Sequence, residues 1–293
     1  MRSITSFVGK AMPTNLACNV QRVKKLLLLP AAALLLTSCT VMDIVGPRAN
    51  GEIMALAKQA SADWVFGDPS REQWREMRKK QSEELKGEAR RLCGLDAQGQ
   101  TPASCDVSYG DTDLPAEGNA DALLEHTVAA ADKVPAESVD LIVAQAIDAL
   151  TLSPVNLDPV AETVSDTADT EAARDLLARE NAMYYGLGVA LAYADSDLRE
   201  RVGELREASH ERTAALARVL GPVEGAADEA LVPASGYDFA EGYAEPANAE
   251  QAAQLVNTMQ DDLVKQWRYS AAHAESAAWR EDAIRLAAHA QRT

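Results

Sequence analysis

The fold is decided by two adjacent stretches of the sequence, LARENAMYYGLGVAL at Leu177–Leu191 and SDLRERVGELREASHERTAALARVL at Ser196–Leu220. In both stretches apolar residues recur every three or four positions, which is the spacing of one face of an α-helix. The turn between them falls near Asp195-Ser196, and Gly221-Pro222 is a typical helix stop. The two stretches therefore predict an antiparallel helical hairpin.

A second hairpin follows in the sequence. Residues 221–246 contain Gly and Pro and predict a crossover, after which a capping box at Asn248 and Gln251 begins a third helix. A fourth helix covers about residues 275–291, although neither Gly nor Pro separates it from the third, so a single kinked helix is the alternative. Two hairpins joined by a long crossover are typical of a ferritin-like four-helix bundle, which we place at residues 169–293.

The first half of the chain repeats this order of two helices, a long loop and two helices. It covers residues 48–152, with Asp68-Pro69 as the expected start of its second helix, and a linker at residues 153–168 follows. Runs of β-branched and aromatic residues are scarce, so we predict an all-α protein in which this N-terminal helical region packs against the bundle. Small residues on the first bundle helix leave room for a helix of that region: Ala182, Gly186, Ala190 and Ala194.

The charge balance is strongly acidic. Against 28 Lys and Arg stand 45 Asp and Glu, which gives a formal net charge of −17 over 293 residues. Such a chain is a poor partner for nucleic acid, because affinity for nucleic acid rests on neutralising phosphates. A share of 47% hydrophobic residues is ordinary for a folded protein and argues against disorder. One basic cluster is interleaved with glutamates, and we interpret it as a solvated helix face: Arg75, Arg78, Lys79 and Lys80.

The N-terminus has the pattern of an exported lipoprotein. Residues 1–38 carry five basic and no acidic residues, and the apolar run Leu26–Leu36 ends just before a cysteine. As a helix this run would rise about 16 Å, too little to cross a hydrocarbon core of ~30 Å. Leu36-Thr37-Ser38-Cys39 resembles the lipobox of bacterial lipoproteins. The resemblance implies a signal peptide at residues 1–38, a diacylglycerol on Cys39 and a tether at residues 39–47. A plain signal peptide or an uncleaved anchor are the alternatives.

The remaining cysteines predict one disulfide. Once Cys18 is removed with the signal peptide and Cys39 is acylated, Cys93 and Cys105 are left. An oxidising exterior favours a bond between them, and the Gly and Ser residues of the intervening loop allow it to close. A metal pair is the alternative, but neither His nor a further Cys lies nearby in the sequence.

Several short motifs follow one another along the predicted bundle. They are Glu180, Tyr184-Tyr185-Gly186-Leu187-Gly188-Val189, His210, Tyr243-Ala244-Glu245-Pro246 and Trp267. In this order, and together with the lipobox, they resemble a family of actinobacterial lipoproteins with a C-terminal ferritin-like domain of unknown function. The resemblance covers about residues 170–290, and the Cys93–Cys105 loop is similar to the N-terminal part of relatives in that family. It implies a fold and an extracytoplasmic location, but no activity.

A metal site in the bundle is not expected. Ferritin-like carboxylate sites use Glu-x-x-His on two of their four helices, and the stretch from Glu207 to His210 supplies that spacing once. At about 100° per residue, however, Glu207 points away from the apolar face of its helix and His210 points to the side. The last helix has Glu281-x-x-Ile284 in place of a second motif. We therefore predict no metal and no cofactor, with Glu207 and His210 as weak candidates.

The apolar faces of the first hairpin carry one acid and one base. Glu180 lies fifteen residues before the turn and Arg212 about sixteen after it, so antiparallel pairing places them at the same height. A buried carboxylate needs such a partner, because desolvation of an unpaired charge is expensive. We therefore predict a buried Glu180–Arg212 ion pair where metal-binding relatives hold a cation. The alternative is that both side chains extend to solvent.

These features predict a membrane-anchored envelope lipoprotein that acts as a non-enzymatic interaction or scaffold module. Its expected partners are the membrane, through the diacylglycerol on Cys39, and an envelope protein at the extracytoplasmic face. The sequence contains no Gly-x-Ser-x-Gly, phosphate loop, Cys-x-x-Cys or zinc-protease helix motif. A ferritin-like metal-binding or oxidase domain is the first alternative. A solute-binding lipoprotein is the second, although the two-lobed α/β pattern of that class is missing here.

Overall fold

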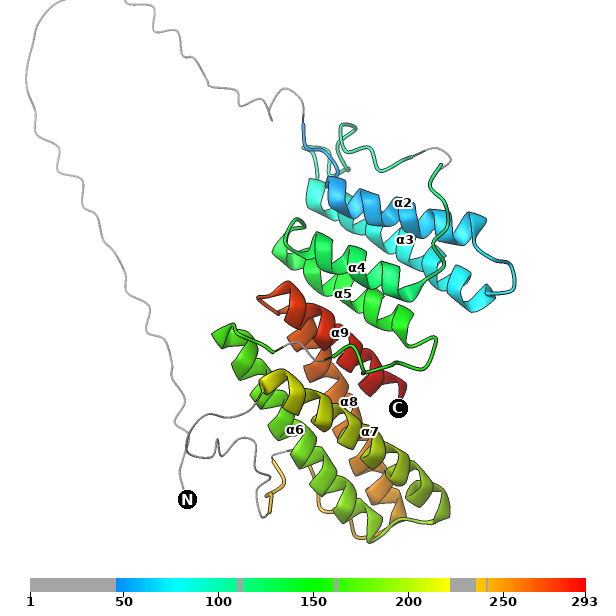
Figure 1. The fold of residues 1–293 in the computed structure, drawn as a ribbon. Coiled ribbons are helices and arrows are strands. Elements are labelled where there is room, and N and C mark those ends of the chain that lie inside the picture. Colours follow the sequence, from blue (N-terminus) through cyan, green and yellow to red (C-terminus); the bar gives the residue numbers. More distant parts are fainter. Residues whose placement is uncertain (1–45, 110–112, 161–162, 222–235, 241) are drawn as a thin grey trace, which may run out of the picture. The chain divides into compact units, whose positions relative to one another are not determined.

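Helical spacing and side-chain caps account for the secondary structure of the computed structural model (Figure 1). The structure describes residues 46–109, 113–160, 163–221, 236–240 and 242–293, and within these ranges it contains helices and no strand. The prediction of an all-α protein is therefore confirmed for the described residues. The helices are α2 (Gly51–Phe66), α3 (Glu72–Cys93), α4 (Ala120–Ala131), α5 (Ala136–Leu150), α6 (Thr167–Leu191), α7 (Ser196–Leu220), α8 (Ala249–Ala272) and α9 (Ala277–Arg292).

The predicted membrane attachment concerns residues that the structure does not describe. The signal peptide at residues 1–38, the acylation site Cys39 and most of the tether at residues 39–47 lie outside the described ranges. Among the helices that are described, none is long and apolar enough to cross a membrane.

Side-chain caps determine where most of the helices begin. Asp195 accepts a hydrogen bond from the amide of Leu198, and Asn248 accepts one from the amide of Gln251. Both bonds satisfy an amide that has no partner inside the helix, so α7 and α8 begin where the sequence predicts. Gly221, with φ at +68°, follows the end of α7 in a conformation that favours glycine.

Two predicted helix starts are wrong, because other hydrogen bonds set the first turn. The Asp68 carboxylate accepts from the amide and the hydroxyl of Ser70 in a local turn, and α3 begins after that turn. In α6 the Asp166 carboxylate accepts from the amides of Ala168 and Asp169, so this helix begins at Thr167, two residues before the predicted start of the bundle at residue 169.

The helices pair as four hairpins, α2–α3, α4–α5, α6–α7 and α8–α9 (Figure 1). The α2–α3 hairpin contacts α4–α5, α4–α5 contacts α8–α9, and α8–α9 contacts α6–α7. In the C-terminal half α6 packs against α7 and α8, and α9 packs against the same two helices. These four helices therefore share one core, whose fully or almost fully buried members include Leu187, Leu205, Val256, Trp267, Trp279 and Ile284.

The last two helices are separate, which the sequence leaves open. Residues 273–276 turn between α8 and α9, and the Ser276 hydroxyl caps α9 by accepting from the amide of Trp279. Asp169, at the start of α6 and only 1% exposed, accepts from the amides of Glu275 and Ser276 at 2.8 Å each. A buried carboxylate therefore holds this turn against the start of α6.

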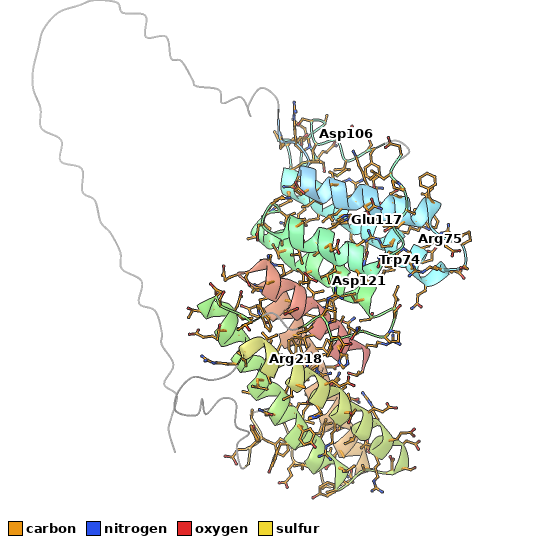
Figure 2. The ribbon with its side chains drawn as sticks, viewed as in Figure 1. Trp74, Arg75, Asp106, Glu117, Asp121 and Arg218 are labelled. Carbon is orange, nitrogen blue, oxygen red and sulfur yellow. A yellow bond between two sulfur atoms is a disulfide. The ribbon has the colours of Figure 1, made fainter. Side chains whose placement is uncertain are left out.

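Arginines of the C-terminal helices reach carboxylates of the α4–α5 hairpin. The pairs are Arg268–Asp148 at 2.9 Å, Arg280–Asp132 at 3.2 Å and Arg285–Asp121 at 2.7 Å. Asp121 marks the first turn of α4, and Figure 2 shows its place on the ribbon. In each pair the cation belongs to α8 or α9 and the anion to the α4–α5 hairpin. The two halves of the chain therefore meet with complementary charges.

The small-residue row of α6 receives α8, and the prediction of a helix from the N-terminal half is wrong. A Cβ added at Gly186 would collide with the sulfur of Met259, a residue of α8. The spacing of small residues shows that a helix face can be approached closely, but it does not show which of several apolar helices will approach it.

Candidate functional site

The Glu180 carboxylate lies between α6, α7 and α8 and is fully buried. Arg212 donates to both of its oxygens, from Nε to Oε1 at 2.5 Å and from Nη2 to Oε2 at 3.1 Å. Trp267 Nε1 donates to Oε1 at 2.8 Å, and the Ser209 hydroxyl donates to Oε2 at 2.7 Å. Glu180 and Arg212, which the sequence places at the same height of the hairpin, therefore meet in a two-pronged buried ion pair.

The number of donors around Glu180 limits its chemistry. An ionised carboxylate offers about four acceptor positions, and four hydrogen bonds from Arg212, Trp267 and Ser209 use them. Such bonds are what makes an anion tolerable away from water. A metal ion would therefore have to displace the Arg212 guanidinium before it met a free oxygen of Glu180.

The other side of Arg212 faces α9. Its Nη1 lies 3.4 Å from His289 Nδ1 and 3.4 Å from the Thr293 hydroxyl, and His289 Nε2 lies 2.9 Å from a carboxylate oxygen of Glu211. Burial and the Arg212 charge lower the pKa of His289, and the bond to Glu211 opposes that effect. We call Glu180, Ser209, Arg212, Trp267 and His289 the buried charge network.

The two weak metal candidates stay apart from this network. Glu207 and His210 are both exposed on α7 and turn away from the core, as their helical positions predict. Within the described residues, no three or more His, Cys, Asp and Glu side chains are grouped so that they could hold a metal ion.

A second buried ion pair, which the sequence analysis missed, joins α2 and α3. Asp63 Oδ2 and Arg78 Nε are 2.8 Å apart, and the two side chains are 2% and 1% exposed. Arg78 also lies over the ring of Trp74, which Figure 2 shows on α3. Burial lowers the pKa of Arg78, and Asp63 opposes that effect. The interpretation of Arg78 as part of a solvated cluster is therefore wrong.

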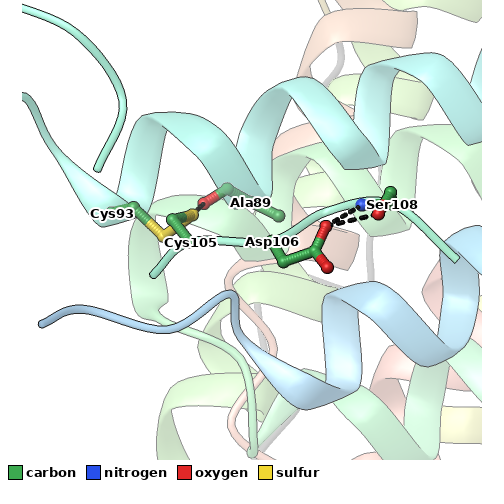
Figure 3. The surroundings of a disulfide bond; sticks show 5 residues. All are labelled: Ala89, Cys93, Cys105, Asp106 and Ser108. Atoms are coloured by element: carbon green, nitrogen blue, oxygen red, sulfur yellow. Dashed lines mark hydrogen bonds between the residues drawn. A yellow bond between two sulfur atoms is a disulfide. The ribbon is translucent and has the colours of Figure 1, made fainter. Parts of the chain in front are cut away.

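The predicted disulfide joins Cys93, at the end of α3, to Cys105 in the following loop (Figure 3). The two Cα atoms are 6.2 Å apart, and the cysteines are 12 positions apart in the sequence. The neighbouring Asp106 accepts hydrogen bonds from the hydroxyl and the amide of Ser108, and these bonds lower its pKa. The disulfide prediction is confirmed, and the beginning of this long loop is closed covalently onto α3.

A cavity of about 240 Å³ lies between α6, α8 and the segment that precedes α8. Buried apolar side chains line one part of it, namely Met183, Met259 and Leu263. The rings of Tyr185 and Tyr237 stand 5.3 Å apart at the cavity and are inclined by 50°. The complete aromatic lining consists of Tyr185 from α6 and Tyr237, Phe239 and Tyr243 from the segment before α8.

Polar side chains complete the cavity: Arg179, Asp238, Asp262 and Gln266. The Tyr243 hydroxyl donates to Asp262 Oδ2 at 2.7 Å, and burial together with this bond raises the pKa of Tyr243 to about 12. Arg179 is paired with Asp175, one turn earlier on α6, at 2.6 Å. The Tyr243 phenol is therefore neutral and held in place.

The sequence does not predict that these residues form a cavity, although Tyr185 and Tyr243 belong to the motifs of the predicted bundle and Gly186 to its small-residue row. Four of the ten Tyr and Phe residues in the chain meet there, and three of the four lie in the predicted crossover at residues 221–246. Three aromatic residues within seven positions are unusual in a chain with 5% aromatic residues, and this local clustering could have indicated a site. The sequence does not show that Tyr185 on α6 joins them. No family model matches this chain, and neither does any curated protein or solved structure.

Proposed function

We propose that this protein is a lipid-anchored envelope protein whose helical body is a non-enzymatic interaction module at the extracytoplasmic face of the membrane. The observation that carries the proposal is the environment of Glu180, whose carboxylate is saturated by Arg212, Ser209 and Trp267. Where a metal-binding bundle holds a cation, this chain supplies a guanidinium. A carboxylate in this state positions helices and offers no free oxygen to a metal ion.

We further propose that residues 169–293 form a ferritin-like four-helix bundle. The contacts support this connectivity, because α6 and α9 each pack against both α7 and α8. Asp169 at the start of α6 meets the α8–α9 turn, whereas Gly186 near its end meets Met259, so α6 and α8 are antiparallel. With a long connection between α7 and α8, this arrangement is the one that ferritin-like folds use.

The anchor rests on the lipobox at Leu36–Cys39, since two acyl chains suffice for stable membrane attachment. Expressed in a host that processes lipoproteins, the full chain is expected to yield a mature protein that begins at Cys39 and carries a diacylglycerol. Mass spectrometry of the membrane fraction measures this directly, with Cys39→Ser as the control that loses the lipid. A mature protein that starts at another residue would contradict the proposal.

The interaction function is tested by cross-linking the acylated protein in intact membranes and recovering what is attached to it. An envelope protein recovered with the wild-type chain, and depleted with Cys39→Ser, supports the proposal. Failure to recover any reproducible companion counts against it. Metal analysis of the same preparation tests the rival, because about two iron or manganese ions per chain that disappear in Glu180→Ala would indicate a ferritin-like metal centre.

A further inference from the structure

We propose that the cavity between α6, α8 and the segment that carries Tyr237, Phe239 and Tyr243 binds a small alkylated ammonium ion. This inference goes beyond the proposed function, because it depends neither on the lipid anchor nor on a protein partner. It rests on the aromatic lining of the cavity, on the charges around it and on its size.

The aromatic rings that line the cavity favour a cationic ligand. The face of an aromatic ring carries partial negative charge and attracts a cation placed over it. Tyr185 and Tyr237 are inclined by 50°, so that they form a corner and not a stack, and Phe239 and Tyr243 line the same space. Several rings around one small volume are how proteins recognise quaternary ammonium groups.

The charges around the cavity also favour a cation. Asp262 and Asp238 both line it, and Asp238 is exposed. Arg179 is the cation of the lining and is compensated by Asp175, while Lys265 pairs with the second oxygen of Asp262 at 3.0 Å. The chain as a whole carries a net charge of −17, which raises the local concentration of cations at its surface. Since Arg179 and Asp262 are both paired, the exposed Asp238 supplies the further negative charge at the cavity, and that charge disfavours an anionic ligand.

The size and the apolar wall indicate that the ion is small and alkylated. About 240 Å³ is less than the roughly 300–1,000 Å³ of sites for drug-sized ligands. The buried side chains of Met183, Met259 and Leu263 offer no strong acceptor to an N–H group, and an ammonium hydrogen without an acceptor there would be costly. Alkyl groups, in contrast, pack well against thioethers and rings.

The experiment is a calorimetric titration of the full-length protein in a non-ionic detergent. Choline chloride is the probe, and 3,3-dimethylbutan-1-ol, which has the same shape without the charge, is the matched ligand control. We expect choline to bind and the uncharged alcohol to bind at least about tenfold more weakly. Equal affinities would overturn the proposal in favour of a simple apolar site, and choline binding weaker than about 10 mM would overturn it altogether.

Variants then locate the binding at this cavity. Tyr185→Ala and Tyr237→Ala are each expected to weaken choline binding at least about fivefold, whereas Tyr237→Phe keeps the ring and the affinity. Tyr184→Ala is the control, because Tyr184 is as exposed as its neighbour Tyr185 but its ring lies against Arg206 on α7, at 4.2 Å, and does not line the cavity. Unchanged binding in Tyr237→Ala, or an equal loss in Tyr184→Ala, would overturn the assignment. Unfolding curves of each variant separate these results from a loss of fold.

Discussion

The two halves of the chain each bury one acid–arginine pair, but they secure it differently. Asp63 of the α2–α3 hairpin also accepts from the backbone amides of Glu117 and Gly118, which belong to the loop that begins with the disulfide. Glu180 of the α6–α7 hairpin accepts its further hydrogen bonds from side chains on α7 and α8. The first pair therefore holds a loop, and the second holds three helices together.

This difference shows how an ion pair that adds little net stability can still determine the arrangement of the chain. Pairing rarely gains more than the desolvation of both ions costs, but leaving one ion unpaired is strongly unfavourable. The pair therefore penalises any arrangement in which its partners are not at the same height. In the N-terminal half this penalty holds Glu117 and Gly118 of the loop before α4 in place. The Cys93–Cys105 disulfide constrains the beginning of the same loop. In the C-terminal half the penalty fixes the register of α6, α7 and α8, which also share a large apolar core.

The largest expected effect comes from removing the anion of the second pair. Glu180→Ala leaves Arg212 buried without its counter-ion and is expected to lower the free energy of unfolding by about 3–5 kcal/mol. Denaturant titration measures this. Glu207→Ala, an exposed position on α7, is the control and is expected to change stability by less than about 0.5 kcal/mol. A loss below about 1 kcal/mol in Glu180→Ala would show that the pair does not set the helix register.

The corresponding change in the other half, Asp63→Ala, is expected to be about as large but to act elsewhere. Hydrogen exchange should accelerate at the amides of Glu117 and Gly118, which lose their acceptor, and should stay unchanged in α6. If Asp63→Ala also loosened α6, the two pairs would not be independent and the comparison would fail.

The next effect concerns the disulfide. Replacing both Cys93 and Cys105 by Ala is expected to lower the free energy of unfolding by about 2–3 kcal/mol, as the closure of a short loop predicts. Because Asp63 holds a later part of the same loop, this loss should be non-additive with Asp63→Ala by more than about 0.5 kcal/mol. It should be additive with Glu180→Ala. Denaturant titration of the combined variants measures both. Additivity with Asp63→Ala together with non-additivity with Glu180→Ala would contradict the assignment of the first ion pair to the loop and of the second to the helices.

The smallest effect is a pH dependence in the C-terminal half. The folded state lowers the pKa of His289 below its ordinary value of 6.5, so the unfolded chain binds more protons in that range. The contribution of His289 to stability is therefore complete above pH 6.5 and decreases as the pH falls from 6.5 through the folded-state pKa. His289→Asn should flatten the stability profile in this window, whereas the exposed His210→Asn should not. Identical slopes for wild type and His289→Asn would refute the assignment.

Much of the fold could be predicted because it depends on short-range chemistry. The start of α7 at Ser196 and its end before Gly221 follow from the residues at those positions. The pairing of Glu180 with Arg212 needs only the helical repeat and the place of the turn between them. The disulfide needs only a short loop between two cysteines, together with the oxidising exterior that the N-terminal pattern predicts.

The interactions that the sequence does not predict join residues that are distant along the chain. Arg78 shares the helix face of Trp74 and Leu85, so its inward direction was readable, but Asp63 as its partner was not. Asp169 resembles an ordinary first-turn acid, yet it accepts from the α8–α9 turn far along the chain. Trp267 is one of the motifs along the predicted bundle, but its hydrogen bond to Glu180 requires α8 to lie beside α6.

The sequence by itself determined the charge balance, which is a property of composition, and also the all-α class, the hairpins and the disulfide, which depend on residues close together along the chain. Its N-terminal pattern also predicts a lipid anchor at Cys39. The tertiary structure decided which hairpins touch, which helix fills the small-residue face of α6, and that Tyr185 of α6 joins three aromatic residues of the segment before α8 at one cavity. These outcomes depend on which apolar faces meet across long separations, and many pairings of amphipathic helices bury similar areas. The buried carboxylates of Glu180 and Asp169 favour the observed pairing, because their donors on α8 and in the α8–α9 turn are distant in the sequence.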